Sequence, residues 1–256
     1  GAVPLPWRWV RSRTLRGFFG SSAAPAASAA ASTTPGTLDP GREGINHEYF
    51  SANGRRLLDL PLENGGSLQV TAHEASERAA LPGSPPGSWQ EWRVLRFTPA
   101  EGTTNLVQSV TKVSVAPTGP APRTRLRREV LPLEYTKTFA TVVLATLAVL
   151  GAPVLPSPSG GARERLRILC IGLGGGSVPS FFAGGLKNCE VDVVELEPAV
   201  LRAAIEALGF ITGPRLRPAV DDGAAFALRA AEEGGDPYHA VLVDAYDAAG
   251  NVPAEL

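Results

Sequence analysis

Hydrophobic and polar residues alternate over residues 45–115, and this alternation is typical of β-strands that have one buried side. Three short segments there are rich in β-branched residues, and clusters of Pro and Gly such as LPGSPPGS separate them. The segments are SLQVTAH, EWRVLRFTP and NLVQSVTKVSV. The pattern predicts a small antiparallel sheet, and no catalytic constellation is visible in it.

The pattern changes at residue 163, where apolar strands begin to alternate with helical segments. The four predicted strands are RLRILCI, CEVDVVEL, RLRPAV and YHAVLVDAYD. Between them lie the predicted helices SVPSFFAGG, EPAVLRAAIEALG and DDGAAFALRAAEEGG. Strands that alternate with helices of this length predict βαβ units and a parallel sheet covered on both faces. The predicted fold class is therefore α/β, preceded by a small antiparallel β domain.

An apolar run joins these two regions. It extends from Phe139 to Leu150, after a connector that is rich in Pro and Arg. Lys137 and Gly151 bound the run well short of the roughly 20 residues that span a bilayer, so we predict a buried helix and no membrane segment. The connector holds four arginines that we expect in a solvated loop: Arg123, Arg125, Arg127 and Arg128.

Composition and charge exclude several classes of function. The chain has 256 residues, of which 44% are hydrophobic, enough for one sizeable core. Its formal net charge of -1 does not imply nucleic acid or an anionic membrane as a partner. Two cysteines, Cys170 and Cys189, and three histidines show no ligand spacing, so we expect neither a metal site nor a disulfide framework.

The N-terminal segment has the composition of a targeting sequence rather than of a folded domain. From Gly1 to Leu38 there is no Asp or Glu, and a run of Ala, Ser, Thr and Pro follows four arginines: Arg8, Arg11, Arg13 and Arg16. This composition is typical of a transit peptide for a mitochondrion or a plastid. A disordered low-complexity segment has the same composition, and the protein would then be cytoplasmic. The predicted domains are 1–40 (transit or disordered), 41–122 (β-rich), 123–162 (linking helix and Pro/Gly linker) and 163–256 (incomplete Rossmann-like domain).

Glycines and carboxylates follow the predicted parallel strands, at the edge where such sheets bind ligands. Four glycines come after the first strand: Gly172, Gly174, Gly175 and Gly176. Without Cβ atoms, the backbone of this loop can turn sharply and approach a ligand. The later strand ends carry Glu195, then Asp221 and Asp222 with Gly223, then Asp244 and Asp247. An acid at each of these ends predicts one common site, although Asp222 alone could be a helix N-cap.

Two ligands compete for such a site, a dinucleotide and an S-adenosyl compound. Ser177 stands where the dinucleotide fingerprint G-x-G-x-x-G requires Gly or Ala, and an acid-lined site suits a cation better than a pyrophosphate. S-adenosylmethionine, a sulfonium, fits if the glycine loop takes its amino-acid side, Glu195 its ribose and Asp222 its adenine. We therefore favour this cofactor or its decarboxylated form. The candidate cofactor-binding residues are Gly172, Gly174, Gly176, Glu195, Asp222, Gly223 and Asp244.

These motifs carry a resemblance to a known family. The stretches ILCIGLGGGSVPSFF, VDVVELEPAVLRAA, DDGAAFA and YHAVLVDAYDAAGNVP resemble the spermidine synthase-like branch of the S-adenosylmethionine-dependent methyltransferase superfamily, from about Arg163 to Leu256. The resemblance implies a Rossmann-like methyltransferase sheet behind an N-terminal β domain and a linking helix. It also implies that Asp244 and Asp247, which keep the family's spacing of two aspartates, are catalytic.

Two departures from the family pattern bear on the reaction. Gly175 stands where aminopropyltransferases place an amine-binding aspartate, and EYTK does not match their Y-x-E motif. Because polyamine ammonium groups need several carboxylates, we predict methyl transfer to a small-molecule or protein acceptor, with Asp244 as base or orienting group. Polyamine aminopropyl transfer is the alternative, and a catalytically inactive binding protein is a further one. A homodimer is compatible with each of them.

The sequence also raises the question of completeness. Sheets of the resembling superfamily have seven strands, whereas this sequence supplies four, begins with Gly1 and stops at VPAEL. The strand HAVLVDAY is mostly apolar, yet no later strand is available to pair with its outer edge. We therefore expect a fragment that folds marginally.

Overall fold

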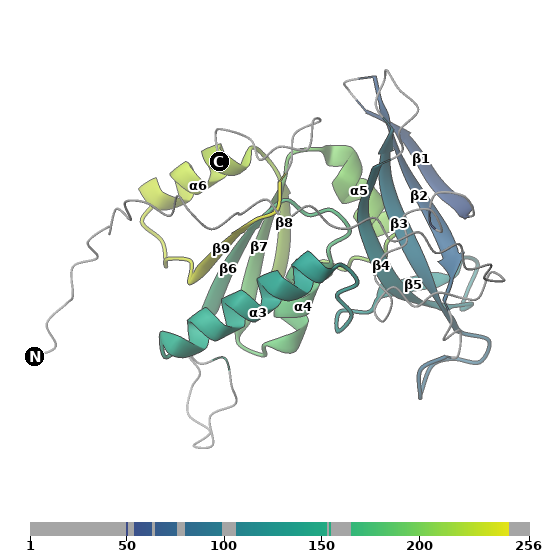
Figure 1. Cartoon of the computed structure of the whole chain (residues 1–256), viewed down its shortest axis with the longest axis horizontal. Coiled ribbons are helices and arrows are strands. Elements are labelled where there is room, and N and C mark those ends of the chain that lie inside the picture. Colours follow the sequence, from purple (N-terminus) through teal and green to yellow (C-terminus); the bar gives the residue numbers. More distant parts are fainter. Residues whose placement is uncertain are drawn as a thin grey trace, which may run out of the picture. The chain divides into compact units, whose positions relative to one another are not determined.

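The chain forms a five-stranded antiparallel sheet and a four-stranded parallel sheet with α-helices beside it (Figure 1). The computed structural model describes residues 50, 54–62, 65–75, 80–98, 106–152, 154 and 165–245. All of them belong to one unit, Gly36–Leu256. The predicted fold class is confirmed. The predicted transit peptide, residues 1–40, lies outside the described residues and stays a prediction.

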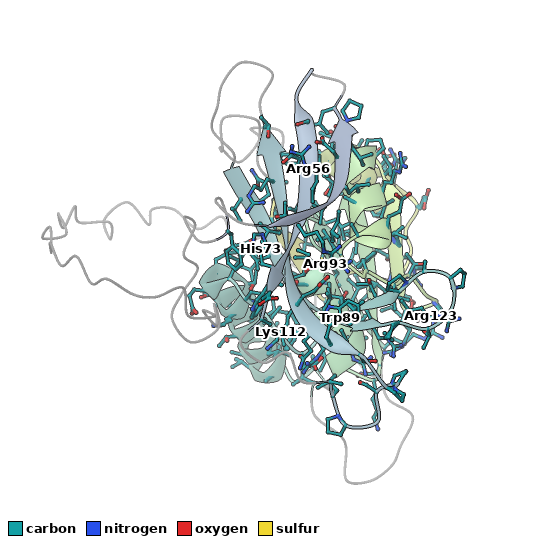
Figure 2. All side chains as sticks on the ribbon, turned by 90° about the vertical axis from the view of Figure 1, so that its right-hand side faces the viewer. Arg56, His73, Trp89, Arg93, Lys112 and Arg123 are labelled. Carbon is teal, nitrogen blue, oxygen red and sulfur yellow. The ribbon has the colours of Figure 1, made fainter. Side chains whose placement is uncertain are left out.

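The antiparallel sheet has the strand order β1-β2-β3-β4-β5. Its strands are β1 (Arg55–Pro61), β2 (Ser67–Glu74), β3 (Trp89–Thr98), β4 (Leu106–Ala116) and β5 (Arg123–Leu126). Strand β3 is buried along most of its length because successive side chains point to opposite faces and both faces are covered. Leu95 packs in the main core, whereas Trp92 and Val94 pack in a second cluster with Phe50. Figure 2 shows the side chains of this sheet, with Arg93 near its centre.

Strand β5 corrects two predictions. The arginine-rich connector does not begin as a solvated loop, because residues Arg123–Leu126 pair with β4. The predicted domain boundary after residue 122 therefore falls just before a strand of the same sheet. Arg123 and Arg125 are exposed, whereas Leu126 is buried and its N–H donates to the carbonyl oxygen of Gly209 at 2.9 Å. The alternation of exposed and buried side chains in this strand is hard to recognise in the sequence, because its exposed positions are arginines in a basic cluster.

The parallel sheet follows the predicted alternation of strands and helices. Its elements are β6 (Leu166–Ile171), α4 (Ser177–Gly185), β7 (Cys189–Glu195), α5 (Pro198–Glu206), β8 (Leu216–Val220), α6 (Gly223–Glu232) and β9 (Ala240–Val243). All of its pairs are parallel, and the order is β8-β7-β6-β9. The chain thus moves outward from β6 to β8 and returns to place β9 on the other side of β6. In such sheets the ligand binds where the order reverses, at the carboxyl ends of the two strands.

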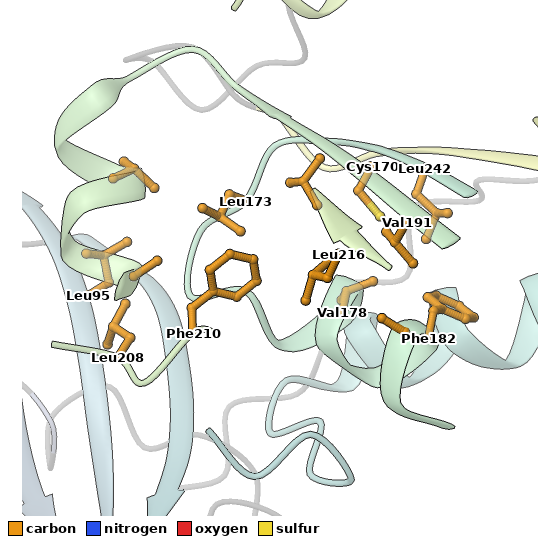
Figure 3. Packing of buried hydrophobic residues seen from close by; sticks show 14 of the residues in the cluster. Leu95, Cys170, Leu173, Val178, Phe182, Val191, Leu208, Phe210, Leu216 and Leu242 are labelled. Atoms are coloured by element: carbon orange, nitrogen blue, oxygen red, sulfur yellow. The ribbon is translucent and has the colours of Figure 1, made fainter. Parts of the chain in front are cut away.

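One hydrophobic core connects the two sheets. Figure 3 shows Leu95 of β3 close to Leu208, with Phe210, Leu173 and Phe182 in the same cluster. A polar contact supports this packing, because the buried guanidinium of Arg93 donates to the carbonyl oxygen of Ala207. The glycine loop after β6 is therefore held between two sheets rather than by one.

Helix α3 (Glu134–Val149) is the predicted linking helix, but it is buried along one side only, and the prediction of a buried helix is corrected to that extent. Only Thr136, Ala140 and Leu147 are buried, whereas Val142 is 56% exposed and Val149 is 86% exposed. The sequence pattern misleads because Thr, Ala and Val have small side chains with little apolar surface each, and such residues can lie on either side of a helix. No helix in the described part of the chain has the length and hydropathy needed to cross a membrane.

A network of ion pairs joins the strands of the parallel sheet at Asp192 on β7. Its carboxylate accepts hydrogen bonds from Arg217 at 2.8 Å, from the Tyr238 hydroxyl at 2.8 Å and from Arg167 at 3.3 Å. Burial raises the pKa of Asp192, but these hydrogen bonds outweigh burial and hold the pKa below its usual range. The ionised carboxylate is thus stabilised by residues from both neighbouring strands.

We expect Asp192→Asn to lower the free energy of unfolding by about 1–3 kcal/mol, because it leaves two arginines and a tyrosine without a charged acceptor. Since the pKa of Asp192 is lower in the folded state, this stabilisation is present above the pKa of the unfolded chain and is lost as the pH falls through the folded value. Urea unfolding at neutral and acidic pH measures both effects. Glu206→Gln is the control, because the exposed Arg202–Glu206 pair should contribute less than about 1 kcal/mol.

Candidate functional site

A cavity of about 460 Å³, including its open mouth, lies where β6 and β9 end. The glycine loop, strand β4, helix α3, the start of α4 and the ends of β6 and β9 all contribute to its lining. Its lining includes Gly172, Gly176, Asp244, Ser109, Tyr135 and Phe139. The cavity therefore combines the predicted ligand edge of the parallel sheet with residues of the preceding domain.

Gly172 brings the ends of β6 and β9 together. Its φ is 94°, and an added Cβ atom would overlap the carbonyl oxygen of Asp244. The Asp244 N–H donates to the carbonyl oxygen of Ile171 at 2.8 Å, which fixes this approach. Only glycine combines this backbone conformation with such a close contact.

Gly174 and Gly175 are glycines for a reason that the sequence did not indicate. An added Cβ at Gly174 would lie 2.5 Å from the Ser109 Oγ atom, and one at Gly175 would lie 2.6 Å from the Thr111 Cγ2 atom. The Gly175 N–H donates to the Ser109 Oγ atom at 3.0 Å. These two glycines thus let β4 approach the loop, whereas we had expected a ligand to require them. Gly176, the N-cap residue of α4, lies against the ring of Phe210.

Glu195 lies at the end of β7 and holds the glycine loop through its carboxylate. One oxygen accepts from the Leu173 N–H at 2.9 Å, and the other accepts from the Glu197 N–H at 3.0 Å. Burial raises the pKa of Glu195, although these backbone hydrogen bonds oppose the shift. The Gly174 backbone is a third donor to this carboxylate. Because an ionised carboxylate has about four acceptor positions, Glu195 retains acceptor capacity for the ribose. Glu195 is not among the described residues that line the cavity. It is hydrogen-bonded to Leu173, and Leu173 does line the cavity.

We expect Glu195→Gln to weaken binding of an S-adenosyl ligand by about 1.5–3 kcal/mol, because a charged acceptor for two hydroxyls becomes a neutral one. Calorimetric titration with S-adenosylhomocysteine measures the change. Glu197→Gln is the neighbouring control, because its carboxylate accepts from the Ala199 N–H as the N-cap of α5. Equal affinity in Glu195→Gln and the wild type would exclude Glu195 from the binding site.

The acids after β8 have structural roles in the described chain. Asp222 is the N-cap of α6 and accepts from the Ala225 N–H at 2.7 Å, while Asp221 forms an ion pair with Arg229. Gly223 begins α6. None of the three lies in the cavity lining within the described residues. The contact of Asp222 with adenine therefore stays a prediction.

Asp244 reaches the cavity directly from the end of β9. Burial raises the pKa of Asp244, and a hydrogen bond from the Tyr135 hydroxyl to its Oδ2 atom, at 3.2 Å, partly opposes the shift. No sequence pattern identifies Tyr135 as a site residue, although it lies in the EYTK stretch that departs from the family's Y-x-E motif. The second predicted catalytic aspartate, Asp247, lies outside the described residues.

The described residues offer no alternative centre for metal or thiol chemistry. No three His, Cys, Asp or Glu side chains among them gather as metal ligands would. Cys170 and Cys189 are free and buried. Burial raises the pKa of Cys189 to about 12 and raises the pKa of Cys170 further, so both remain thiols.

The fold and the site define a Rossmann-like α/β domain with a candidate ligand site: the cavity opens at the point where the strand order reverses, between a glycine loop and an acid. No family model matches the chain. The eEF1A lysine and N-terminal methyltransferase of Bos taurus is 32% identical over 95 residues, which are 37% of this chain and 14% of that protein. The polyamine aminopropyltransferase of Vibrio vulnificus is 37% identical over 81 residues, 32% of this chain and 27% of that protein.

These matches confirm the predicted resemblance, since one relative is a methyltransferase and the other an aminopropyltransferase. Each match spans less than a third of the relative's length. Among solved structures, human methyltransferase-like protein 13 in complex with SAH is 25% identical, with a TM-score of 0.35 over 44% of this chain and 48% of that one. A probable spermidine synthase from Corynebacterium glutamicum is 14% identical, with a TM-score of 0.44 over 77% and 53% of the two chains.

Proposed function

We propose that this chain is the cofactor-binding part of an S-adenosylmethionine-dependent methyltransferase that acts on an amine. The observation that carries the proposal is the placement of Asp244 in the cavity, next to the glycine loop, where a cationic acceptor can be held beside the cofactor. The relatives support the same chemistry, because the names of the methyltransferases specify lysine and N-terminal acceptors. We infer a protein amine as the acceptor.

The surroundings of Gly175 favour methyl transfer over aminopropyl transfer. Aspartate at this position would meet Thr111 and the Ser109 Cβ atom, which lie 2.6 Å and 3.2 Å from the place of its Cβ. Among the described residues that line the cavity, Asp244 is the only acid. A single carboxylate suits one ammonium group better than a polyamine with several.

The residues present fit the cofactor in chemistry. The Glu195 carboxylate lies beside the glycine loop, and the Asp244 carboxylate belongs to the cavity lining. When bound, S-adenosylmethionine supplies an electrophilic methyl group on a sulfonium. Asp244 would accept the proton that the acceptor ammonium must lose before its nitrogen can attack, and Tyr135 would orient the Asp244 carboxylate through its Oδ2 atom. Methyl transfer would form one N–C bond at the amine as one S–C bond of the cofactor breaks, with S-adenosylhomocysteine as the leaving product.

Calorimetric binding of S-adenosylmethionine and of its decarboxylated form tests the proposal. We expect tighter binding of the carboxylated compound, and methyl transfer from it to lysine-containing peptides. Tighter binding of the decarboxylated compound would instead favour the aminopropyltransferase alternative, which the match to the Vibrio vulnificus protein supports. Binding without any transfer would favour a catalytically inactive binding protein.

A further inference from the structure

Ser109 of β4 lies at the point where the antiparallel sheet meets the glycine loop. Its hydroxyl oxygen accepts from the Gly175 N–H at 3.0 Å and would lie 2.5 Å from a Cβ atom at Gly174. Ser109 also lines the cavity. A residue 66 positions before Gly175 thus presents a hydroxyl to the same space as the loop.

The hydrogen bond to Gly175 decides what the Ser109 hydroxyl can do. A serine hydroxyl has one proton to donate and two lone pairs that accept. Because one lone pair is taken by the Gly175 N–H, the orientation of the oxygen is set and its proton remains for another partner. Within the described residues, no acceptor for this proton is present. The hydroxyl is therefore a preoriented donor at the wall of the cavity.

Few other side chains of the cavity can donate to an anion. The Tyr135 hydroxyl donates to Asp244, and the Thr136 hydroxyl donates to the carbonyl oxygen of Leu133 at 2.6 Å. No Lys, Arg or His is found among the described lining residues. Ser109 and Ser177 are the remaining side-chain hydroxyls, and only the Ser109 hydroxyl is oriented by a hydrogen bond in the described part of the chain.

If the proposed function holds, S-adenosylmethionine presents its carboxylate to the side of the cavity that Ser109 lines. With the ribose at Glu195 and the reacting sulfur facing Asp244, the remaining arm of the ligand must occupy the cavity beside the loop and β4. That arm ends in a carboxylate in S-adenosylmethionine, whereas the decarboxylated compound has no carboxylate there. We propose that Ser109 is a specificity-determining residue whose hydroxyl donates to the cofactor carboxylate and so selects the carboxylated compound. This inference rests on the proposed function and names the group that sets its cofactor choice.

A pair of ligands separates this role from a merely structural one. S-adenosylhomocysteine and 5′-methylthioadenosine share the adenosine and the sulfur, but only the first has the amino-acid arm. We expect Ser109→Ala to lower affinity for S-adenosylhomocysteine by about 10- to 100-fold, the scale of a lost hydrogen bond to a charged group. Affinity for 5′-methylthioadenosine should be unchanged. Calorimetric titration of the full chain measures both.

Ser114→Ala is the matched control, because Ser114 lies on the same strand and its Oγ atom has no hydrogen-bond partner among the described residues. It should change neither affinity. If Ser109→Ala weakens both ligands equally, Ser109 only holds the loop, and if it weakens neither, Ser109 does not contact the ligand; both results overturn the inference and leave the proposed function standing. If the wild type binds neither ligand, or binds the decarboxylated cofactor more tightly, the proposed function itself fails.

Discussion

Asp244→Asn is expected to lower methyl transfer by about 100- to 10,000-fold, the range for loss of a positioned acid–base group. Asparagine keeps the shape and can still accept from the Tyr135 hydroxyl, but it cannot take a proton or balance an ammonium. Stability should not fall, because burial raises the pKa of Asp244 and the folded state therefore disfavours its charge. Transfer of a labelled methyl group and thermal unfolding measure the two effects.

The same variant tests the pH dependence of the site. Because the folded pKa of Asp244 lies above its unfolded value, its contribution to stability is largest below the unfolded pKa and is lost as the pH rises through the folded pKa. Binding of a cationic ligand follows the opposite course, since it needs the ionised carboxylate. In the wild type, affinity for S-adenosylmethionine should therefore rise as the pH passes through the raised pKa of Asp244. In Asp244→Asn this increase in affinity with pH should be absent.

Glu232→Gln removes a carboxylate from the exposed end of α6 and is the matched control for charge. It should leave turnover and its pH profile unchanged. Equal turnover in Asp244→Asn and Glu232→Gln would contradict a catalytic role for Asp244. Asp247 would then be the remaining predicted catalytic carboxylate to test.

Gly172→Ala is expected to abolish binding of S-adenosyl ligands and to lower the free energy of unfolding by more than about 2 kcal/mol. The positive φ of Gly172 alone costs an alanine about 1–3 kcal/mol. Its Cβ would also overlap a backbone carbonyl of Asp244, which cannot move unless β9 separates from β6. Urea unfolding and calorimetric titration check the two expectations.

Gly185→Ala provides the control at a glycine without these constraints. Gly185 is the last residue of α4, and no atom of the described residues lies within 4 Å of an added Cβ. Alanine there should leave binding unchanged and raise stability by about 0.4–1 kcal/mol, because it restricts the unfolded chain. If Gly172→Ala behaved in the same way, the close approach of β6 and β9 would not be required for the site.

Local patterns were sufficient to predict most of the parallel sheet. Apolar strands separated by helical segments identified every strand from β6 to β9, and the glycine loop and the acids Glu195 and Asp244 were located by their positions after those strands. Such features depend on residues that are close together in sequence. Errors arose where local composition was ambiguous: arginines concealed β5, and the Thr, Ala and Val residues of α3 did not indicate which side of the helix is exposed.

The sequence by itself determined the order of the strands and helices, the turn at Gly172 and the acids at the strand ends, because each follows from short-range periodicity and backbone conformation. Only the tertiary structure decided which other residues share the cavity. Ser109 is 66 residues from Gly175, and Tyr135 is 109 residues from Asp244. A hydrogen bond between residues so far apart leaves no periodic pattern in either segment, since it depends on how two independently formed sheets pack around one core.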